Sequence, residues 1–132
     1  MSVMEAQIVH LGIEKTWQEV YAFACRPENM PLWASGLSDG LEREGDHWVA
    51  RGPLGVVRVR FAEENDFGVM DHTVTMETGL NVNNAFRVVP NGSGAEIMFT
   101  VLKLPDMDDE QFRRDSDWVL KDLKTLKALL EA

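Results

Sequence analysis

His72 and Asn84 are the polar residues whose positions suggest chemistry, because both fall among apolar residues on one face of a predicted sheet. Near neutral pH an imidazole can act as an acid, a base or a hydrogen-bond donor to a ligand. The Asn84 amide offers a donor and an acceptor, so it can anchor a ligand carbonyl or hydroxyl. The alternative is structural, a buried His72 satisfied by Asn84 or by water. Asp71 cannot orient His72 directly, because neighbouring strand residues point to opposite faces.

An apolar wall is expected around these two polar residues. Aromatic and methionine side chains suit a pocket for a hydrophobic molecule, and core packing is the alternative for most of them. Ser116 can present its hydroxyl inward or bond to its own helix backbone. The candidate ligand-binding residues are His72, Asn84, Trp33, Trp48, Val59, Met70, Met76, Phe86, Phe99, Phe112, Ser116 and Leu120.

Metal and cofactor chemistry have little support in the sequence. His10, His47 and His72 lack close-set partners, and a single cysteine, Cys25, gives no thiolate cluster. Cys25 also has no histidine at a spacing that suits nucleophilic catalysis. Neither Gly-x-Gly-x-x-Gly nor a P-loop occurs. We therefore expect no metal and no cofactor.

Length and charge narrow the classes of partner. The chain has 132 residues, which predicts a single domain over 1–132, and its net charge is -9, with 13 Lys and Arg against 22 Asp and Glu. This charge disfavours nucleic acids and anionic membranes. No apolar run reaches the ~18 residues of a membrane span, and the N-terminus does not have the pattern of a signal peptide. The predicted location is the cytoplasm.

Helical signals lie at both ends of a central strand region. Alternation from Gln7 to Ile13 predicts a strand, and a Thr16-x-x-Glu19 capping box then starts a short helix over about Trp17–Ala24. A second short helix is expected over 28–34, followed by strands between Trp48 and Val101. The C-terminal segment has a helical apolar stripe with a cap at Asp108 and Gln111. The stripe consists of Phe112, Val119, Leu123, Leu126 and Leu130.

The turn signals predict hairpins that share one apolar inner face, because paired positions in a hairpin have a constant sum. A turn at Pro53-Leu54 pairs Trp48 with Val59 and Ala50 with Val57, and a turn at Asn65-Asp66 pairs Val59 with His72 and Phe61 with Met70. A turn centred on Thr78 pairs His72 with Asn84. A turn at Gly92-Ser93 pairs Phe86 with Phe99, and the alternative turn at Asn91-Gly92 shifts that register by two. Arg60 is expected opposite Asp71 on the outer face. The C-terminal helix provides the cover that the inner face needs.

This order of elements resembles the START and Bet v 1-like superfamily, the helix-grip proteins that include polyketide cyclases. The segments that carry the resemblance are Ile13-Glu-Lys-Thr-Trp-Gln-Glu-Val-Tyr-Ala-Phe23 and Arg26-Pro-Glu-Asn-Met-Pro-Leu-Trp33, with 67–72, 87–92 and 117–131. The resemblance covers nearly the whole chain. It implies an α+β fold in which a curved antiparallel sheet wraps around a long C-terminal helix, with two short helices after the first strand. It also implies an apolar cavity between the sheet and that helix.

Two functions follow as hypotheses. The first is binding of a small hydrophobic molecule, of lipid, polyketide or aromatic type, oriented by His72 and Asn84. The second is a polyketide cyclase or dehydratase in which His72 would be the catalytic residue. We favour binding, because the inner face offers one histidine and no carboxylate. Trp118 and Leu129 lie together off the helix stripe, where they suggest a possible homodimer contact.

Overall fold

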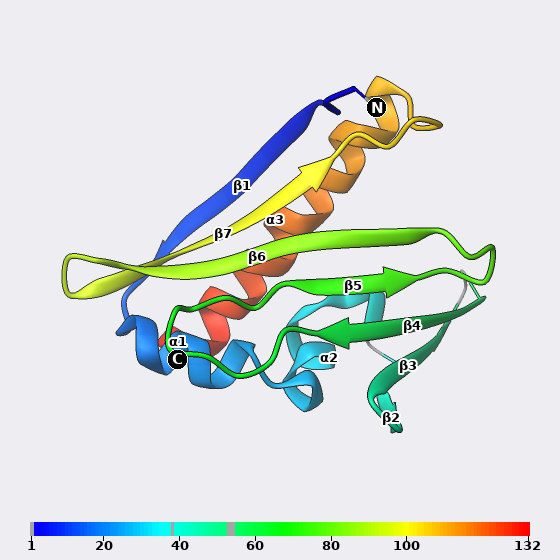
Figure 1. Cartoon of the computed structure of the whole chain (residues 1–132). Coiled ribbons are helices and arrows are strands. Elements are labelled where there is room, and N and C mark those ends of the chain that lie inside the picture. Colours follow the sequence, from blue (N-terminus) through cyan, green and yellow to red (C-terminus); the bar gives the residue numbers. More distant parts are fainter. Residues whose placement is uncertain (1, 38, 53–54) are drawn as a thin grey trace.

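The computed structural model describes residues 2–37, 39–52 and 55–132, which form one antiparallel sheet and a set of helices. The sheet has seven strands in the order β1-β7-β6-β5-β4-β3-β2. The strands are β1 (Ala6–Ile13), β2 (Glu42–Glu44), β3 (His47–Gly52), β4 (Gly55–Phe61), β5 (His72–Thr75), β6 (Asn81–Asn91) and β7 (Gly94–Leu102). The helices are α1 (Trp17–Ala24), η1 (Pro27–Asn29), α2 (Met30–Trp33), η2 (Ser35–Leu37) and α3 (Asp109–Glu131). The expected helix-grip arrangement is confirmed (Figure 1).

Helix starts follow the predicted caps. The Thr16 hydroxyl oxygen accepts from the Glu19 amide at 3.2 Å, and the Asp108 carboxylate accepts from the Gln111 amide at 2.8 Å. The second short helix is not continuous over 28–34. It is a 3₁₀ turn followed by α2, because Pro31 has no amide hydrogen to donate to Pro27 one turn earlier.

Three of the four predicted hairpin registers are confirmed. Trp48 lies opposite Val59, His72 opposite Asn84, and Phe86 opposite Phe99. The Pro53-Leu54 turn itself lies outside the described residues. The Gly92-Ser93 alternative is the one adopted, because Asn91 pairs with Gly94.

The predicted register of β4 and β5 is wrong by two residues. Phe61, not Val59, lies opposite His72. The reason is the loop between the strands, where the Asn65 side chain bonds the Phe67 amide at 2.9 Å and the Val69 amide at 3.1 Å. This side-chain scaffold replaces the tight turn expected at Asn65-Asp66. A shift of two keeps every side chain on its predicted face.

The expected pairing of Arg60 with Asp71 is also wrong. Arg60 lies opposite Thr73 as a result of the shifted register, and its guanidinium contacts Asp46 at 3.1 Å. Asp71 instead pairs with Arg87 at 2.9 Å. Both ion pairs lie on the solvent side of the sheet, where such pairs contribute at most about 1 kcal/mol.

Helix α3 covers one part of the inner face. It packs mainly on β1, β7 and α2, while α1 packs on β6 and β7 (Figure 1). Of the predicted stripe, Phe112, Leu123 and Leu126 are buried, and Val119 and Leu130 are half-buried. Most of the largest fully buried side chains gather here, namely Phe86, Ile97, Leu123, Leu126, Val20 and Val88, whereas Val59 is buried separately on β4. The core therefore lies under β1, β7 and β6.

A buried carboxylate joins α3 to η2. One oxygen of Asp122 accepts from the Ser35 hydroxyl at 2.8 Å and from the Ser35 amide at 3.3 Å. Asp122 is 8% exposed, and burial raises the pKa of its carboxyl despite these hydrogen bonds. The hydrogen bonds from Ser35 hold the carboxylate in place, but its burial in the ionised form lowers the stability of the folded protein.

Replacing Gly68 by alanine should be much more harmful than the same change at Gly79. Both glycines have positive φ, +70° and +88°, so both substitutions strain the backbone by about 1 kcal/mol. At Gly68 the added methyl group would also overlap the Val88 carbonyl oxygen, whereas open space surrounds Gly79. Urea unfolding should show a loss of about 3 kcal/mol or more for Gly68→Ala only. Equal losses in the two variants would contradict this packing.

Asp122→Asn should gain stability relative to the wild type as pH rises. Burial raises the Asp122 pKa above its ordinary 3.8, so the folded state favours the protonated form and loses stability as pH increases through that range. Asparagine keeps an oxygen for Ser35 and cannot ionise. Unfolding free energies at pH 3 and pH 7 measure the difference, with Asp117→Asn on the exposed side of α3 as the control. A relative loss at pH 7 would contradict the assignment.

Candidate functional site

The structure divides the predicted site residues between two places. His72, Asn84, Trp48, Val59, Met70, Met76, Phe86, Phe99 and, from α2, Trp33 lie on or against the inner face of the sheet, whereas Phe112, Ser116 and Leu120 line a groove between β1 and α3. The groove does not include His72 or Asn84. The two sets therefore belong to two different surfaces.

A row of rings crosses the inner face through His72. The ring centroid of His72 lies 5.7 Å from that of Phe61 and 5.9 Å from that of Phe99. The ring centroids of Phe99 and Phe86 are 5.6 Å apart, and those of Phe86 and Trp33 are 5.5 Å apart. All these pairs are tilted or edge-on, the arrangements that aromatic rings prefer. Strands β4, β5, β7 and β6 and helix α2 each supply one ring, and we call this set the aromatic row.

His72 is hydrogen-bonded at both ring nitrogens. Its Nδ1 lies 3.3 Å from the Met70 carbonyl oxygen, and its Nε2 lies 3.4 Å from the Asn84 amide nitrogen. We assign the neutral tautomer in which Nδ1–H donates to Met70 and Nε2 accepts from Asn84. Burial lowers the pKa of His72 below its ordinary value. The geometry makes His72 a neutral group held by its own protein.

No carboxylate orients this imidazole among the contacts of the described residues. The Asp71 carboxylate accepts from Arg87 at 2.9 Å and from the Phe86 amide at 2.9 Å, on the outer side of the sheet. Burial opposes ionisation of Asp71, but these hydrogen bonds outweigh it and lower its pKa. The sequence-based exclusion of an Asp71–His72 dyad agrees with this placement.

Part of the inner face remains open to solvent. Trp33, Val59, Met70 and Phe86 are buried and serve packing. Ala50 and His72 are buried as well. Other inner-face residues from β3 to β7 are only half-buried, and these are Trp48, Val57, Phe61, Val74, Met76, Val82, Asn84 and Phe99. Phe61, Val74 and Val82 were not among the predicted site residues. The signal that could have found Phe61 is its pairing with His72, which the two-residue register error concealed.

Trp33 carries an unusual polar atom. Its indole N–H is buried and has no hydrogen-bond partner in the described part of the chain. The side chain is 4% exposed and packs on Phe86. An unpaired buried donor reduces stability by about 1–3 kcal/mol.

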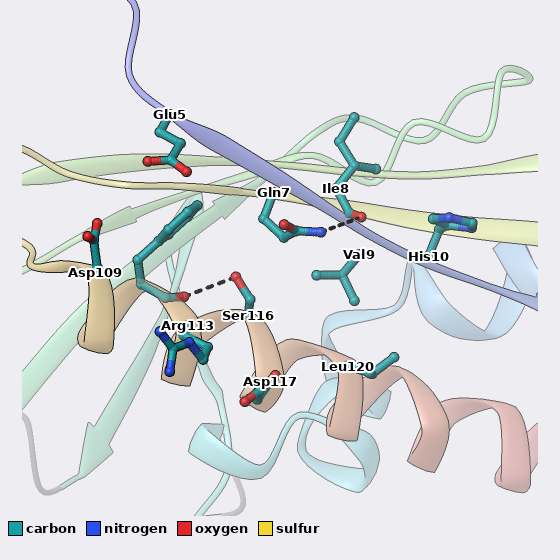
Figure 2. A pocket seen from close by; sticks show the side chains of 11 residues that line it. Glu5, Gln7, Ile8, Val9, His10, Asp109, Arg113, Ser116, Asp117 and Leu120 are labelled. Atoms are coloured by element: carbon teal, nitrogen blue, oxygen red, sulfur yellow. Dashed lines mark hydrogen bonds between the residues drawn. The ribbon is translucent and has the colours of Figure 1, made fainter.

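The second place is a groove of about 720 Å³ between β1 and α3 (Figure 2). Its residues are Glu5, Gln7, Ile8, Val9, His10, Asp109, Phe112, Arg113, Ser116, Asp117 and Leu120. Figure 2 shows Glu5 and Asp109 at one end and His10 at the other. Ser116 donates to the Phe112 carbonyl oxygen at 3.0 Å, the backbone-bonded alternative of the two considered. The remaining residues were missed, because no motif marks the open edge of a strand.

The described residues contain neither a candidate metal cluster nor a candidate membrane-spanning helix. No cluster of three or more His, Cys, Asp or Glu side chains has the arrangement of a metal site. None of the described helices is long and apolar enough to cross a bilayer.

Comparison with solved structures supports the fold. No family model and no curated protein matches the sequence. An uncharacterized protein from Bacillus thuringiensis superposes with a TM-score of 0.76 at 12% identity, covering 97% of this chain and 100% of the other. Ara h 8.0201 gives a TM-score of 0.66 at 12% identity, with 96% and 97% covered.

A third similar structure, DynU16 from the dynemicin biosynthetic locus, gives a TM-score of 0.74 at 11% identity. The match covers 96% of this chain and 47% of DynU16, so the chain spans about half of that protein. At these identities the likeness establishes a Bet v 1-like, helix-grip fold.

His72 should make the protein less stable in mild acid. Because burial lowers its folded pKa below the ordinary 6.5, the unfolded chain takes up a proton first and stability falls as pH drops below that value. The stability advantage of the wild type over His72→Gln should therefore be smaller at pH 5 than at pH 7.5. Urea titrations at the two pH values measure it, with His10→Gln on the exposed side of β1 as the control. An advantage that does not change with pH would contradict the buried, neutral assignment.

Proposed function

We propose that this protein binds a small hydrophobic molecule, of lipid, polyketide or aromatic type, against the open part of its inner sheet face. The observation that carries the proposal is the half-buried state of Phe61 and Phe99, which flank His72 in the aromatic row. A ring or alkyl chain on these surfaces would remove them from water, worth about 25 cal/mol per Å². We also propose membership of the START and Bet v 1-like superfamily and a cytoplasmic location.

Asn84 is the polar anchor in this proposal. Its amide nitrogen contacts the Nε2 of His72 at 3.4 Å, which uses one of its two hydrogens. Within the described residues the second hydrogen and the carbonyl oxygen of this side chain have no partner, so they are available to a ligand hydroxyl or carbonyl. His72 acts through Asn84, because its two nitrogens are already bonded inside the protein. A few fixed polar groups in an apolar surface are typical of ligand sites.

Binding is favoured over the cyclase or dehydratase activity considered above. Proton transfer to a polyketide needs groups of matched acidity within hydrogen-bond reach of the substrate. Around His72 the described neighbours are Phe61, Phe99, Asn84 and the Met70 carbonyl, while the Asp71 carboxylate bonds Arg87 on the other face. These contacts support a holding role for His72.

Phe99→Ala should weaken binding of N-phenyl-1-naphthylamine by about tenfold or more. This neutral dye fluoresces in apolar surroundings, and the variant removes a ring that is expected to contact it, an effect of about 1.4 kcal/mol or more. Titration of the dye measures the dissociation constants. Leu129→Ala is the matched control, because Leu129 is an exposed apolar residue on α3 away from the row.

Equal affinities in the Phe99→Ala and Leu129→Ala variants, with both folded by circular dichroism, would overturn the proposed site. Native mass spectrometry of protein purified from its own host then gives the ligand class. Recovery of a bound molecule supports a carrier. Conversion of a supplied polyketide by the wild type but not by His72→Ala would establish the enzyme instead.

A further inference from the structure

Strand β1 is an edge of the sheet, and its outward backbone groups can be assigned. The Lys103 amide donates to the Glu5 carbonyl at 2.8 Å, so odd-numbered residues direct their backbone groups towards β7. The Gly12 carbonyl accepts instead from Lys127 of α3 at 2.8 Å. Because these directions alternate along an antiparallel strand, the backbone groups of Ala6, Ile8, His10 and Gly12 point away from the sheet.

Helix α3 closes only one half of this edge. Lys127 bonds the Gly12 carbonyl, and Glu131 accepts from the Glu14 amide at 2.8 Å. Lys127 and Glu131 also pair with each other, which fixes this cover. Charged side chains placed over an edge strand prevent pairing with another strand. The C-terminal half of β1 is thus protected.

The other half of the edge is open. From Ala6 to His10 the one side-chain contact to an outward backbone group within the described residues is weak, at 3.5 Å from the Gln7 amide nitrogen to the Ile8 carbonyl (Figure 2). Five residues span about 17 Å, enough to pair with an added strand. The groove of about 720 Å³ runs beside this same stretch. It can take the inward side chains of such a strand, on a floor that includes Val9, Phe112 and Leu120.

The charge of the groove indicates which kind of strand can bind there. The groove carries three carboxylates, on Glu5, Asp109 and Asp117, against one guanidinium, on Arg113. Lys103 compensates Asp109, whereas Glu5 and Asp117 form no ion pair in the part of the chain that the structure describes. The net charge of -9 adds to this field. A second copy of β1 would bring the same acidic groups together, so a basic strand fits better.

We propose that the open half of β1 binds an extended peptide segment of a partner protein, in which apolar residues alternate with lysine or arginine. Its backbone pairs with Ala6, Ile8 and His10. Because alternate side chains of a strand point to opposite faces, its cations enter the groove near Glu5 and Asp117, with their stems on the apolar floor, and its apolar side chains lie on the other face beside the exposed Ile8. Backbone pairing gives affinity in this type of recognition, and the pockets give specificity. The site is separate from the aromatic row.

The probe is an acetylated and amidated hexapeptide of alternating lysine and valine, titrated into the ¹⁵N-labelled full chain. The amide signals of Ala6, Ile8 and His10 should shift. A peptide N-methylated on the bonding edge, and one with glutamate in place of lysine, should each bind at least tenfold more weakly. No binding of the lysine peptide, or equal binding of the N-methylated one, would overturn the proposal.

Ile8→Pro provides the test on the protein side. The Ile8 amide points away from β7, and proline is tolerated at such edge positions. Peptide affinity should fall at least tenfold in Ile8→Pro and less than threefold in the matched control Ile8→Ala, while both variants bind N-phenyl-1-naphthylamine like the wild type. Equal peptide affinity in the two variants would overturn the proposal.

The same experiments would detect two other occupants of the edge, a second copy of the chain or the small hydrophobic molecule. A wild-type dimer by sedimentation velocity that Ile8→Pro dissociates would assign the edge to a second copy and overturn the peptide site. Displacement of the dye by the peptide would place the small molecule in the groove and overturn the separation of the two sites. A monomer that binds peptide and dye together supports both proposals.

Discussion

One helix cannot cover the apolar face of a seven-strand sheet. An α-helix with its side chains is about 10–12 Å wide, whereas six strand spacings of about 4.8 Å span about 29 Å. Helix α3 lies mainly over β1 and β7, and α1 packs on β6 and β7. The inner face is most deeply buried at this end of the sheet, whereas towards β3, β4 and β5 half-buried residues such as Trp48, Val57 and Val74 lie among buried ones. The open inner face beside the aromatic row follows from this mismatch in width.

The histidine in this face is compatible with the fold because both of its nitrogens are bonded. The Met70 carbonyl and the Asn84 amide complete the neutral ring, and Phe61 and Phe99 flank it. An unpaired imidazole in the same place would cost several kcal/mol. Asn84 is thereby fixed in position, with one donor and one acceptor that no other described residue uses. The same contacts that make His72 structural make Asn84 the available polar group.

The fold could be predicted from the sequence, because an error of two residues in strand register leaves each side chain on the same face of the sheet. The register of β4 and β5 was misplaced, yet Val59, Phe61 and His72 still occupy the predicted face. The error arose at Asn65, whose side chain builds a loop that turn propensities do not encode. The groove was missed for another reason. Whether the outward carbonyl of Gly12 or that of Ile8 is bonded by Lys127 depends on where this side chain lies in the folded protein.

The most direct test of partial cover is the solvent exposure of methyl groups on the inner face. A neutral nitroxide dissolved in the buffer should broaden the methyl NMR signals of Val74, Met76 and Val82 much more than those of Val88, Ile97 and Leu123. That contrast would show that α3 leaves the β3–β6 side accessible. Equal protection of both groups would mean that the inner face is closed throughout, and it would contradict the account.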